Sequence, residues 1–344
     1  MKTQSIQEKK AEVLFRRDLF KHRVLGLSIF DDEFDRQTMV KIFKKNMVDT
    51  VDDVKRLPEY KQFLFALEIG AECCQRAVAI QDQLGIKCYA VDISFESLSS
   101  IKNYADDLGI SSLPQRICCD ATFLPFASKS FHLVYSYQAL HHFHDPTYVI
   151  NEISRLTQKV YLGVEEPTRR LLRFRIGKHK KGMYHPSMLN RGLLRRFFDD
   201  TFYERCCNEI RYGVVENNNI SLNSWKHMLN LFFRSEWFCG RSIHPRNRMV
   251  FDILHRLRWL LTYELTGSVI SWIARPQVQI PEKQILEPVL ICPDCLVRSR
   301  DENPLKIQRG YLECSCCAKV YPEVDNIYIL LPVELRNSLY PDFG

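Results

Sequence analysis

Short apolar segments and helical segments alternate between Phe63 and Glu166, and no other feature of the sequence constrains the fold as strongly. Five of the apolar segments are expected to be strands: Phe63–Gly70, Lys87–Ser94, Pro114–Ala121, Phe131–Tyr137 and Lys159–Glu166. Helical periodicity follows the first, second and fourth of them, and Gly85 is a suitable end for the first helix. Strands that are apolar on both faces are typical of a parallel sheet covered by helices on both sides. We therefore expect a doubly wound α/β fold.

The remaining sequence completes this sheet and adds a second unit. Past the fifth strand, the patterns predict a helix at SMLNRGLLRRFFDD, a strand at Thr201–Gly213, a helix around MVFDILHRLRWLLTYE and a closing strand at Gly267–Pro276. The expected parts are an N-terminal helical segment that flanks the sheet and forms part of a lid (1–60), a seven-stranded domain (61–277) with a basic insertion around 168–260, a linker (278–286), a small β domain (287–335) and a tail (336–344).

The sequence contains no evident membrane or secretory segment. Its most apolar late stretch, Leu257–Ala274, is interrupted by Arg258, Glu264 and Gly267 and is slightly short for a bilayer span. No basic segment followed by an apolar core opens the chain, so we expect neither a secretory signal nor a transmembrane segment. The thirteen cysteines then favour reduced thiols and metal ligation in a cytoplasmic protein.

The positive charge is concentrated in the middle of the chain. Between Thr168 and Leu260 there are 19 Lys and Arg and 7 Asp and Glu, which gives a net charge of +12. Between Glu287 and Gly344 there are 6 Lys and Arg and 9 Asp and Glu, which gives a net charge of −3. These cations either form solvated helix faces or bind an anionic partner. Several of them follow the fifth strand directly: Arg169, Arg170, Arg173, Arg175, Lys178, Lys180 and Lys181.

Polar residues end three of the expected strands, at the edge where parallel sheets bind ligands. Gly70 ends the first strand, Asp92 ends the second 22 residues later, and Asp120 ends the third. A glycine lets a ligand approach the backbone, and an acid at the second position can accept both hydroxyls of a ribose. Asp120 is placed to meet an adenine amino group. The spacing indicates a nucleotide-like cofactor.

Three segments carry a family resemblance. FALEIGAE, YAVDIS and CDATFLPFASKSFHLVYSYQALHHFHDP resemble, in this order, the motifs of S-adenosylmethionine-dependent methyltransferases of the ubiquinone/menaquinone-biosynthesis type. The resemblance covers about Lys61 to Pro276. It implies a Rossmann-like methyltransferase sheet with S-adenosyl-L-methionine as cofactor. The implied cofactor-binding residues are Glu68, Gly70, Glu72, Asp92, Ile93, Asp120, Ala121 and Gln138.

The first motif departs from the family pattern. The resemblance assigns Glu68 and Gly70 to the methionine part of the cofactor, and Gln138 to its carboxylate or sulfonium side. Of the three glycines in the family sequence E-x-G-x-G-x-G, only Gly70 is present here, because Glu72 and Cys74 replace the later two. The Glu72 side chain either crowds the space of the cofactor or faces its ammonium group.

Candidate catalytic residues follow the fourth and fifth strands. His141 and His142 include a candidate general base, although they could equally be a structural pair. Tyr137, Glu165 and Glu166 also stand at strand ends, where a substrate would lie. Methyl transfer from a sulfonium needs mainly in-line positioning, so a base is not obligatory.

Four cysteines near the C-terminus have the spacing of a metal site. Cys292 and Cys295 form one C-x2-C pair, and Cys314 and Cys317 form a second one eighteen residues later. Each pair can place two thiolates on one edge of a tetrahedron, which predicts a zinc ribbon with a structural Zn²⁺ and leaves Cys316 as a spare. The alternative is four buried thiols without a metal.

The ribbon segment carries a resemblance of its own. PVLICPDC and LECSCCAKVYPEVDNIYILLP resemble the small zinc ribbons that serve as partner subunits activating translation-related methyltransferases. Asn326 and Tyr328 replace a glycine and a proline of that pattern. The resemblance implies a possible protein partner, and the acidic balance of the segment argues against nucleic-acid binding by the ribbon itself.

Three functions remain open from the sequence. The first is a methyltransferase for an anionic small-molecule, lipid-linked or glycan substrate. The second is an RNA methyltransferase that uses the basic segment for the phosphate backbone, although no aromatic RNA-binding module is evident. The third is a degenerate methyltransferase fold that acts as a scaffold through its ribbon.

Overall fold

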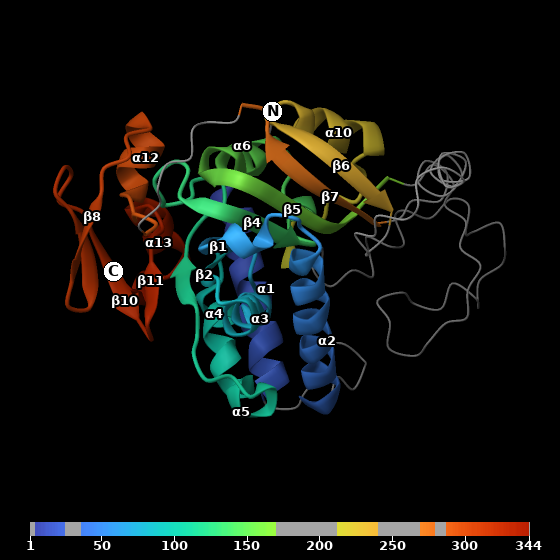
Figure 1. The fold of residues 1–344 in the computed structure, drawn as a ribbon. Coiled ribbons are helices and arrows are strands. Elements are labelled where there is room, and N and C mark those ends of the chain that lie inside the picture. The colour runs from blue at the N-terminus through green and yellow to red at the C-terminus, as the bar shows by residue number, and fades with distance from the viewer. Residues whose placement is uncertain (1–3, 25–35, 170–211, 240–268, 279–286, 344) are drawn as a thin grey trace, which may run out of the picture.

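Within the residues that the structure describes, eleven strands form a single sheet in the order β6-β7-β5-β4-β1-β2-β3-β11-β10-β9-β8. The computed structural model in Figure 1 describes residues 4–24, 36–169, 212–239, 269–278 and 287–343. Seven of the strands precede the cysteine-rich segment: β1 Phe65–Ile69, β2 Lys87–Asp92, β3 Gln115–Cys118, β4 Phe131–Tyr137, β5 Thr157–Pro167, β6 Phe233–Cys239 and β7 Val269–Pro276.

The first five strands form the predicted parallel sheet. β1 pairs in parallel with β2 and β4, β2 with β3, and β4 with β5. β7 is antiparallel to both β5 and β6. This order is the Rossmann-like arrangement that the sequence analysis expects, and ligands of such sheets bind at the carboxyl ends of the parallel strands.

The predicted strand count is too low, because the sheet continues into the C-terminal segment. β11 (Ile327–Ile329) pairs in parallel with β3, with Tyr328 opposite Ile117. The other strands of the segment then follow by antiparallel pairing: β10 Val320–Val324, β9 Tyr311–Cys314 and β8 Leu305–Gln308. The small β unit is therefore an extension of the main sheet and not a separate layer.

The sixth strand lies outside the range expected for it. The predicted strand Thr201–Gly213 falls almost wholly outside the described residues, and Tyr212 and Gly213 are helix and turn. β6 instead occupies Phe233–Cys239 at the edge of the sheet. An edge strand is less buried than an inner strand, and β6 contains the exposed charged residues Arg234 and Glu236. It therefore lacks the continuous apolar sequence that identifies the inner strands.

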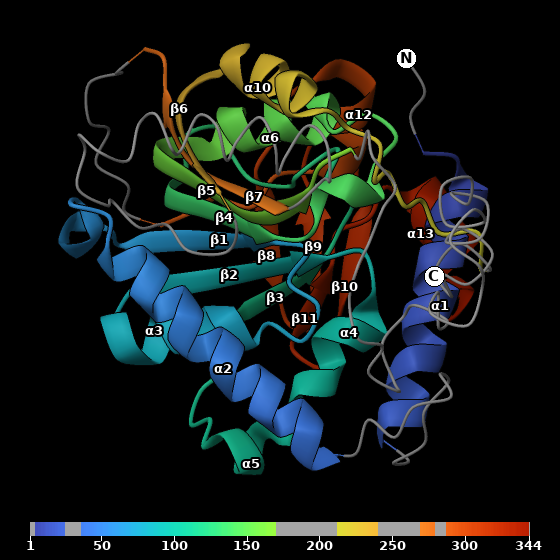
Figure 2. The same ribbon diagram turned by 90° about the vertical axis from the view of Figure 1, so that its right-hand side faces the viewer.

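Helices cover both faces of the sheet (Figures 1 and 2). One face carries α1 Ile6–Val24, α2 Arg36–Lys55, α3 Gln75–Leu84, α4 Phe95–Ser100 and α5 Ala105–Leu108, and the other carries α6 Thr147–Leu156 and α10 Leu222–Asn230. Alternate side chains of β1 enter two separate apolar clusters: Ala66 packs toward the first face, and Leu67 and Ile69 pack toward the second. This two-sided burial explains the uninterrupted apolar runs.

The C-terminal segment packs tightly on the edge of β3. Two further helices belong to it, α12 Pro293–Ser299 and α13 Val333–Leu339. Buried Arg116 of β3 donates hydrogen bonds to the carbonyl oxygens of Leu98 and Asp325, both at 3.0 Å. Ile327 and Ile329 complete the apolar cluster beneath α4. The C-terminal segment and the sheet thus share one core.

Several expectations concern residues outside the described ranges. They include the helix SMLNRGLLRRFFDD, the stretch MVFDILHRLRWLLTYE and the basic residues from Arg170 to Lys181. Within the described residues, no helix combines the length and the apolar character that a bilayer span requires. Of the late apolar stretch, residues 269–274 are described, and they belong to β7.

Candidate functional site

A cavity of about 450 Å³ opens at the carboxyl ends of β1, β2, β3 and β4. The structure brings almost every predicted cofactor and catalytic residue to its wall. The exceptions are Glu68, Glu165 and Glu166, and the residues at the wall are Gly70, Glu72, Asp92, Ile93, Asp120, Ala121, Tyr137, Gln138, His141 and His142. Four strand ends that are far apart in sequence therefore share one site.

The loop after β1 has a left-handed backbone at Gly70 and at two residues that carry side chains. Gly70 has φ +65°, and a Cβ added there would lie 2.8 Å from the Cβ of Ala139. Glu72 and Cys74, which replace the later glycines, also have positive φ, 48° and 51°. This backbone region is strained for most side chains and free of strain for glycine. The loop thus has positive φ at all three positions where the motif has glycine.

Glu72 turns toward a helix that the first motif does not include. Its Oε1 lies 3.6 Å from Nη1 of Arg16 on α1, while its backbone N–H donates to Oδ2 of Asp92 at 2.9 Å. Asp92 also accepts the N–H of Ser94 at 2.9 Å. Burial raises the pKa of Asp92 to about 6, although Arg16 and the backbone donors act against this rise. The side chain of Glu72 is therefore engaged with α1 at the cavity wall.

Asp120 is held in place at the end of the third strand segment. Its Oδ1 accepts the N–H of Thr122 at 2.9 Å and the hydroxyl of Thr122 at 2.7 Å, and its Oδ2 pairs with Nζ of Lys9 at 2.5 Å. The residue is only 3% exposed. Lys9 belongs to α1, so the same helix contacts acids at two strand ends.

Helix α1 forms one wall of the cavity. Its residues at the wall are Lys9, Glu12, Arg16 and Leu19, with Gln4 just before it. Figure 2 shows α1 beside α4 and α13. Nε2 of Gln4 donates to the carbonyl oxygen of His142 at 2.7 Å. These wall residues could not be predicted from the sequence, because a charged helix without a motif gives no sign of what it covers.

Glu68 lies behind the loop and not in the cavity. Its side chain is 1% exposed, accepts the N–H of Ala77 at 3.1 Å in the first turn of α3 and lies 4.0 Å from Nη1 of Arg76. Burial raises its pKa to about 8, against the opposing effect of Arg76. Glu68 is therefore placed to support the loop after β1 from behind, through its contacts with α3.

Glu166 fixes the loop after β4. The fully buried carboxylate accepts the N–H groups of Ala139 at 2.8 Å, Leu140 at 2.9 Å and His141 at 3.1 Å, and lies 3.0 Å from Nδ1 of His141. Burial alone would raise the pKa of Glu166, but the bond to His141 and the backbone donors hold it below its ordinary value. The carboxylate thus orients the His141 ring.

Tyr137 and Gln138 are held by neighbours outside the cavity. The Tyr137 hydroxyl donates to Oδ2 of Asp53 on α2 at 3.1 Å, and burial raises the pKa of Tyr137 well above its ordinary value. Gln138 adopts φ 51° and donates through Nε2 to Glu165 at 2.8 Å. Tyr137 is therefore unsuited to act as a base, while its ring still contributes to the wall.

The end of α13 supports the turn that follows Asp92. The hydroxyl of buried Tyr340 donates to the carbonyl oxygen of Ile93 at 3.0 Å and accepts the N–H of Phe95 at 2.9 Å. This contact joins residues about 250 positions apart and links the C-terminal unit to the cavity wall. No local motif in the sequence marks it.

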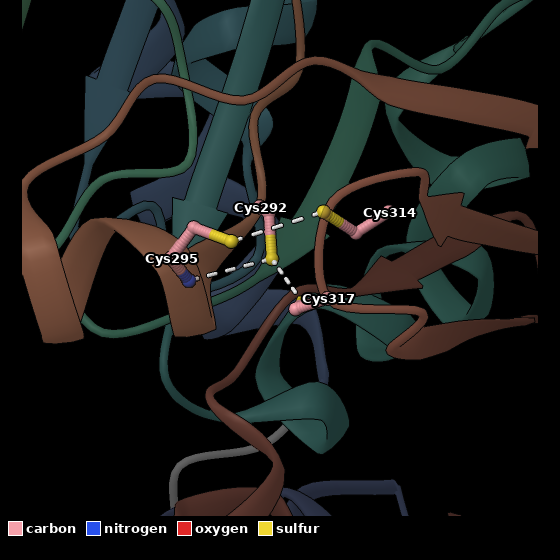
Figure 3. A group of neighbouring side chains, drawn as sticks. All are labelled: Cys292, Cys295, Cys314 and Cys317. Atoms are coloured by element: carbon pink, nitrogen blue, oxygen red, sulfur yellow. Dashed lines mark hydrogen bonds between the residues drawn. The ribbon is translucent and has the colours of Figure 1, made fainter.

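The four predicted cysteine ligands meet in one cluster (Figure 3). The sulfur atoms of Cys292, Cys295, Cys314 and Cys317 all lie within 4.8 Å of one another. Cys292 Sγ lies 3.5 Å from Cys317 Sγ, and Cys295 Sγ lies 3.8 Å from Cys314 Sγ. Tetrahedral thiolates with Zn–S bonds of about 2.3 Å stand about 3.8 Å apart. The four side chains therefore fit a zinc ion, and exposed Cys316 lies outside the cluster.

Comparison with known proteins supports the fold of the central part. Residues 67–160 match the methyltransferase-domain family, and together with the strand order this identifies a methyltransferase-type Rossmann-like domain. No curated protein sequence matches the chain significantly.

Solved structures of similar shape are distant in sequence. Geranyl diphosphate C-methyltransferase from Streptomyces coelicolor A3(2) has 11% identity and a TM-score of 0.49, covering 79% of this chain and 99% of that one. Phosphoethanolamine N-methyltransferase 2 from Haemonchus contortus has 13% identity and a TM-score of 0.46, covering 80% and 60%. A Haloferax volcanii complex between the Trm112 methyltransferase activator and a methyltransferase gives 14% and 0.40, covering 70% and 95%. At these identities, activity and substrate stay open.

Proposed function

We propose that the protein is an S-adenosylmethionine-dependent methyltransferase. The observation that carries the proposal is the convergence of Gly70, Asp92, Asp120 and the loop after β4 on one cavity. Its volume of about 450 Å³ lies in the range of small-molecule sites. The methyltransferase-domain match at residues 67–160 supports the same activity.

The wall residues suit the parts of the cofactor in the order that the sequence predicts. Asp92, with both oxygens already anchored by backbone N–H groups, would accept the ribose hydroxyls. Asp120 and Ala121 would face the adenine. Gly70 leaves the backbone open to the methionine part, and Gln138 lies on that side of the wall.

The chain's contribution to the reaction is mainly positional. S-adenosylmethionine supplies an electrophilic methyl group when bound, and an acceptor must approach it in line. We place the acceptor beside His141 and His142, which line the same cavity. Helix α1 closes one side of the cavity and limits the access of water.

The substrate class rests on charge. The cations that follow β5 favour an anionic small-molecule, lipid-linked or glycan substrate. Arg169 is the described member of this group, and its N–H donates to the carbonyl oxygen of Ile220 at 2.8 Å. Salt-sensitive binding of RNA by the purified protein would instead support the RNA alternative.

Calorimetric titration with S-adenosylmethionine tests the cofactor assignment. We expect binding by the wild type, a large loss of affinity in Asp92→Ala, and unchanged affinity in Asp106→Ala, because Asp106 is exposed on α5 away from the cavity. No binding at millimolar cofactor would contradict the enzyme proposal. Equal affinity of Asp92→Ala and wild type would contradict the ribose assignment alone.

The cysteine cluster is proposed as a structural zinc site, because four thiolates leave no open position for a substrate. Cobalt substitution provides the test, since thiolate-to-cobalt charge transfer reports sulfur ligation. The band should disappear in a Cys292→Ser/Cys314→Ser double variant and persist in Cys316→Ser. Persistence in the double variant would contradict the ligand assignment.

A further inference from the structure

Two histidines and one glutamate meet at the wall of the cavity. His141 and His142 belong to the short helix η3 (Leu140–His142) after β4, and Glu216 lies in the segment before α10. Nε2 of His141 lies 3.8 Å from Oε2 of Glu216, and Nδ1 of His142 lies 3.1 Å from Oε1. One ligand atom from each residue lies within 4.8 Å of the others, and all three residues line the cavity.

The backbone holds these three residues together firmly. The N–H of Asn217 donates to the carbonyl oxygen of His141 at 2.7 Å, and its side-chain amide donates to the carbonyl oxygen of His144 at 3.0 Å. Asn217, the residue after Glu216, thereby ties this segment to the histidine loop at two points, His141 and His144. A ligand set with fixed geometry loses little conformational entropy when an ion binds.

Glu166 adds the outer support that metal-binding histidines usually have. Its buried carboxylate lies 3.0 Å from Nδ1 of His141. A proton on Nδ1 satisfies this contact and leaves the lone pair of Nε2 directed toward Glu216. Carboxylate–histidine–metal arrangements of this kind fix the tautomer and the ring orientation.

From this geometry we infer that His141, His142 and Glu216 bind a divalent transition-metal ion. Two imidazole nitrogens and one carboxylate oxygen are the ligand set of borderline ions such as Zn²⁺ and Fe²⁺, and hard ions such as Mg²⁺ prefer oxygen ligands alone. Three protein ligands leave coordination positions open toward the cavity. In this respect the site differs from the closed four-cysteine cluster.

The metal site refines the substrate class, a step that rests on the proposed function. An open position on a divalent ion beside the methyl donor would take an oxygen atom of the acceptor, such as a hydroxyl or phenolate. The two histidines then act as metal ligands, and the metal orients the acceptor. An acceptor with an oxygen donor next to the methylated atom is the class that this arrangement selects.

Zinc stoichiometry in the full-length protein tests the metal site without any activity readout. After loading with Zn²⁺ and removal of weakly bound ions, the wild type should retain about two zinc ions per chain, one in each site. Glu216→Gln should retain about one, and the Cys292→Ser/Cys314→Ser variant should also retain about one. Glu12→Gln, which changes another carboxylate of the same cavity, should retain two.

Two measurements make the outcome decisive. A retained cobalt–thiolate band in Glu216→Gln shows that the variant is folded, so a loss of zinc from it reports the cavity site. Glu166→Gln should weaken zinc binding at that site by about 10–100-fold. A wild type that retains one zinc, equal to Glu216→Gln, would overturn the inference. Cofactor binding by calorimetry is scored separately, so failure of either proposal is recognised on its own.

Discussion

Replacing Gly70 with alanine should destabilise the protein through two separable effects. The first is conformational: φ at Gly70 is +65°, and a left-handed backbone costs a residue with a Cβ about 1–2 kcal/mol. The second is steric: the new Cβ would lie 2.8 Å from the Cβ of Ala139, and overpacking of this kind costs about 1–3 kcal/mol. The free energy of unfolding should therefore fall by about 2–5 kcal/mol.

Gly85 provides a matched control. Its φ is +69°, but an added Cβ would meet nothing within 4 Å, so Gly85→Ala should carry only the conformational cost. Urea denaturation of both variants isolates the steric part as their difference. The double variant Gly70→Ala/Ala139→Gly should recover that part, because it removes the opposing methyl group.

The same variants report on the cofactor. Gly70 lines the cavity, so Gly70→Ala should also weaken binding of S-adenosylmethionine, whereas Gly85→Ala should not. Equal losses of stability in the two alanine variants, with no recovery in the double variant, would refute the steric argument. Unchanged cofactor affinity in Gly70→Ala would refute the placement of Gly70 at the ligand.

Three further predictions concern the site and its supports. Because burial raises the pKa of Asp92 to about 6, the ionised form that accepts the ribose hydroxyls is lost below that pH. Calorimetry across this range should show weaker binding of S-adenosylmethionine on the acid side. A pH-independent affinity would contradict the role of Asp92 in binding the ribose. Glu68 has a pKa raised from 4.5 to about 8, so the folded state binds the proton more tightly than the unfolded state. Its contribution to stability is then lost between these two pH values as pH rises, and Glu68→Gln should show a smaller decline in urea denaturation. Tyr340→Phe removes the hydrogen bonds to Ile93 and Phe95 that support the turn after Asp92. A loss of about 1 kcal/mol from this support should weaken cofactor binding about fivefold. The cobalt–thiolate band serves as the folding control and should not change.

The inner strands could be predicted from the sequence because burial on both faces leaves a strong pattern. β4 has the predicted range, Phe131–Tyr137, and every one of its residues is buried. β6 was missed because an edge strand mixes Arg234 and Glu236 into its apolar run. The four cysteines of the predicted metal site could be chosen from their spacing alone, and they do meet in one cluster.

The rest of the site depends on contacts that local sequence does not encode. Glu216 is an isolated acid in a basic segment, and the fold brings it within 3.1 Å of His142. The left-handed backbone of Glu72 and Cys74 is equally hidden, because few residues other than glycine adopt it. The pairing of Arg16 with Glu72 requires α1 to lie over the cavity, which helical periodicity cannot show.

The parallel pairing of β11 with β3 determines how the ribbon responds to dilution. A ribbon supplied by a second chain would dissociate as the protein concentration falls, whereas a strand joined to the same chain stays at a high effective concentration. The pairing also occupies the free hydrogen-bonding groups of β3, which would otherwise offer another chain an edge to join. The ratio of the C-terminal unit to the rest of the sheet is thus fixed at synthesis and cannot be adjusted by expression of a separate subunit.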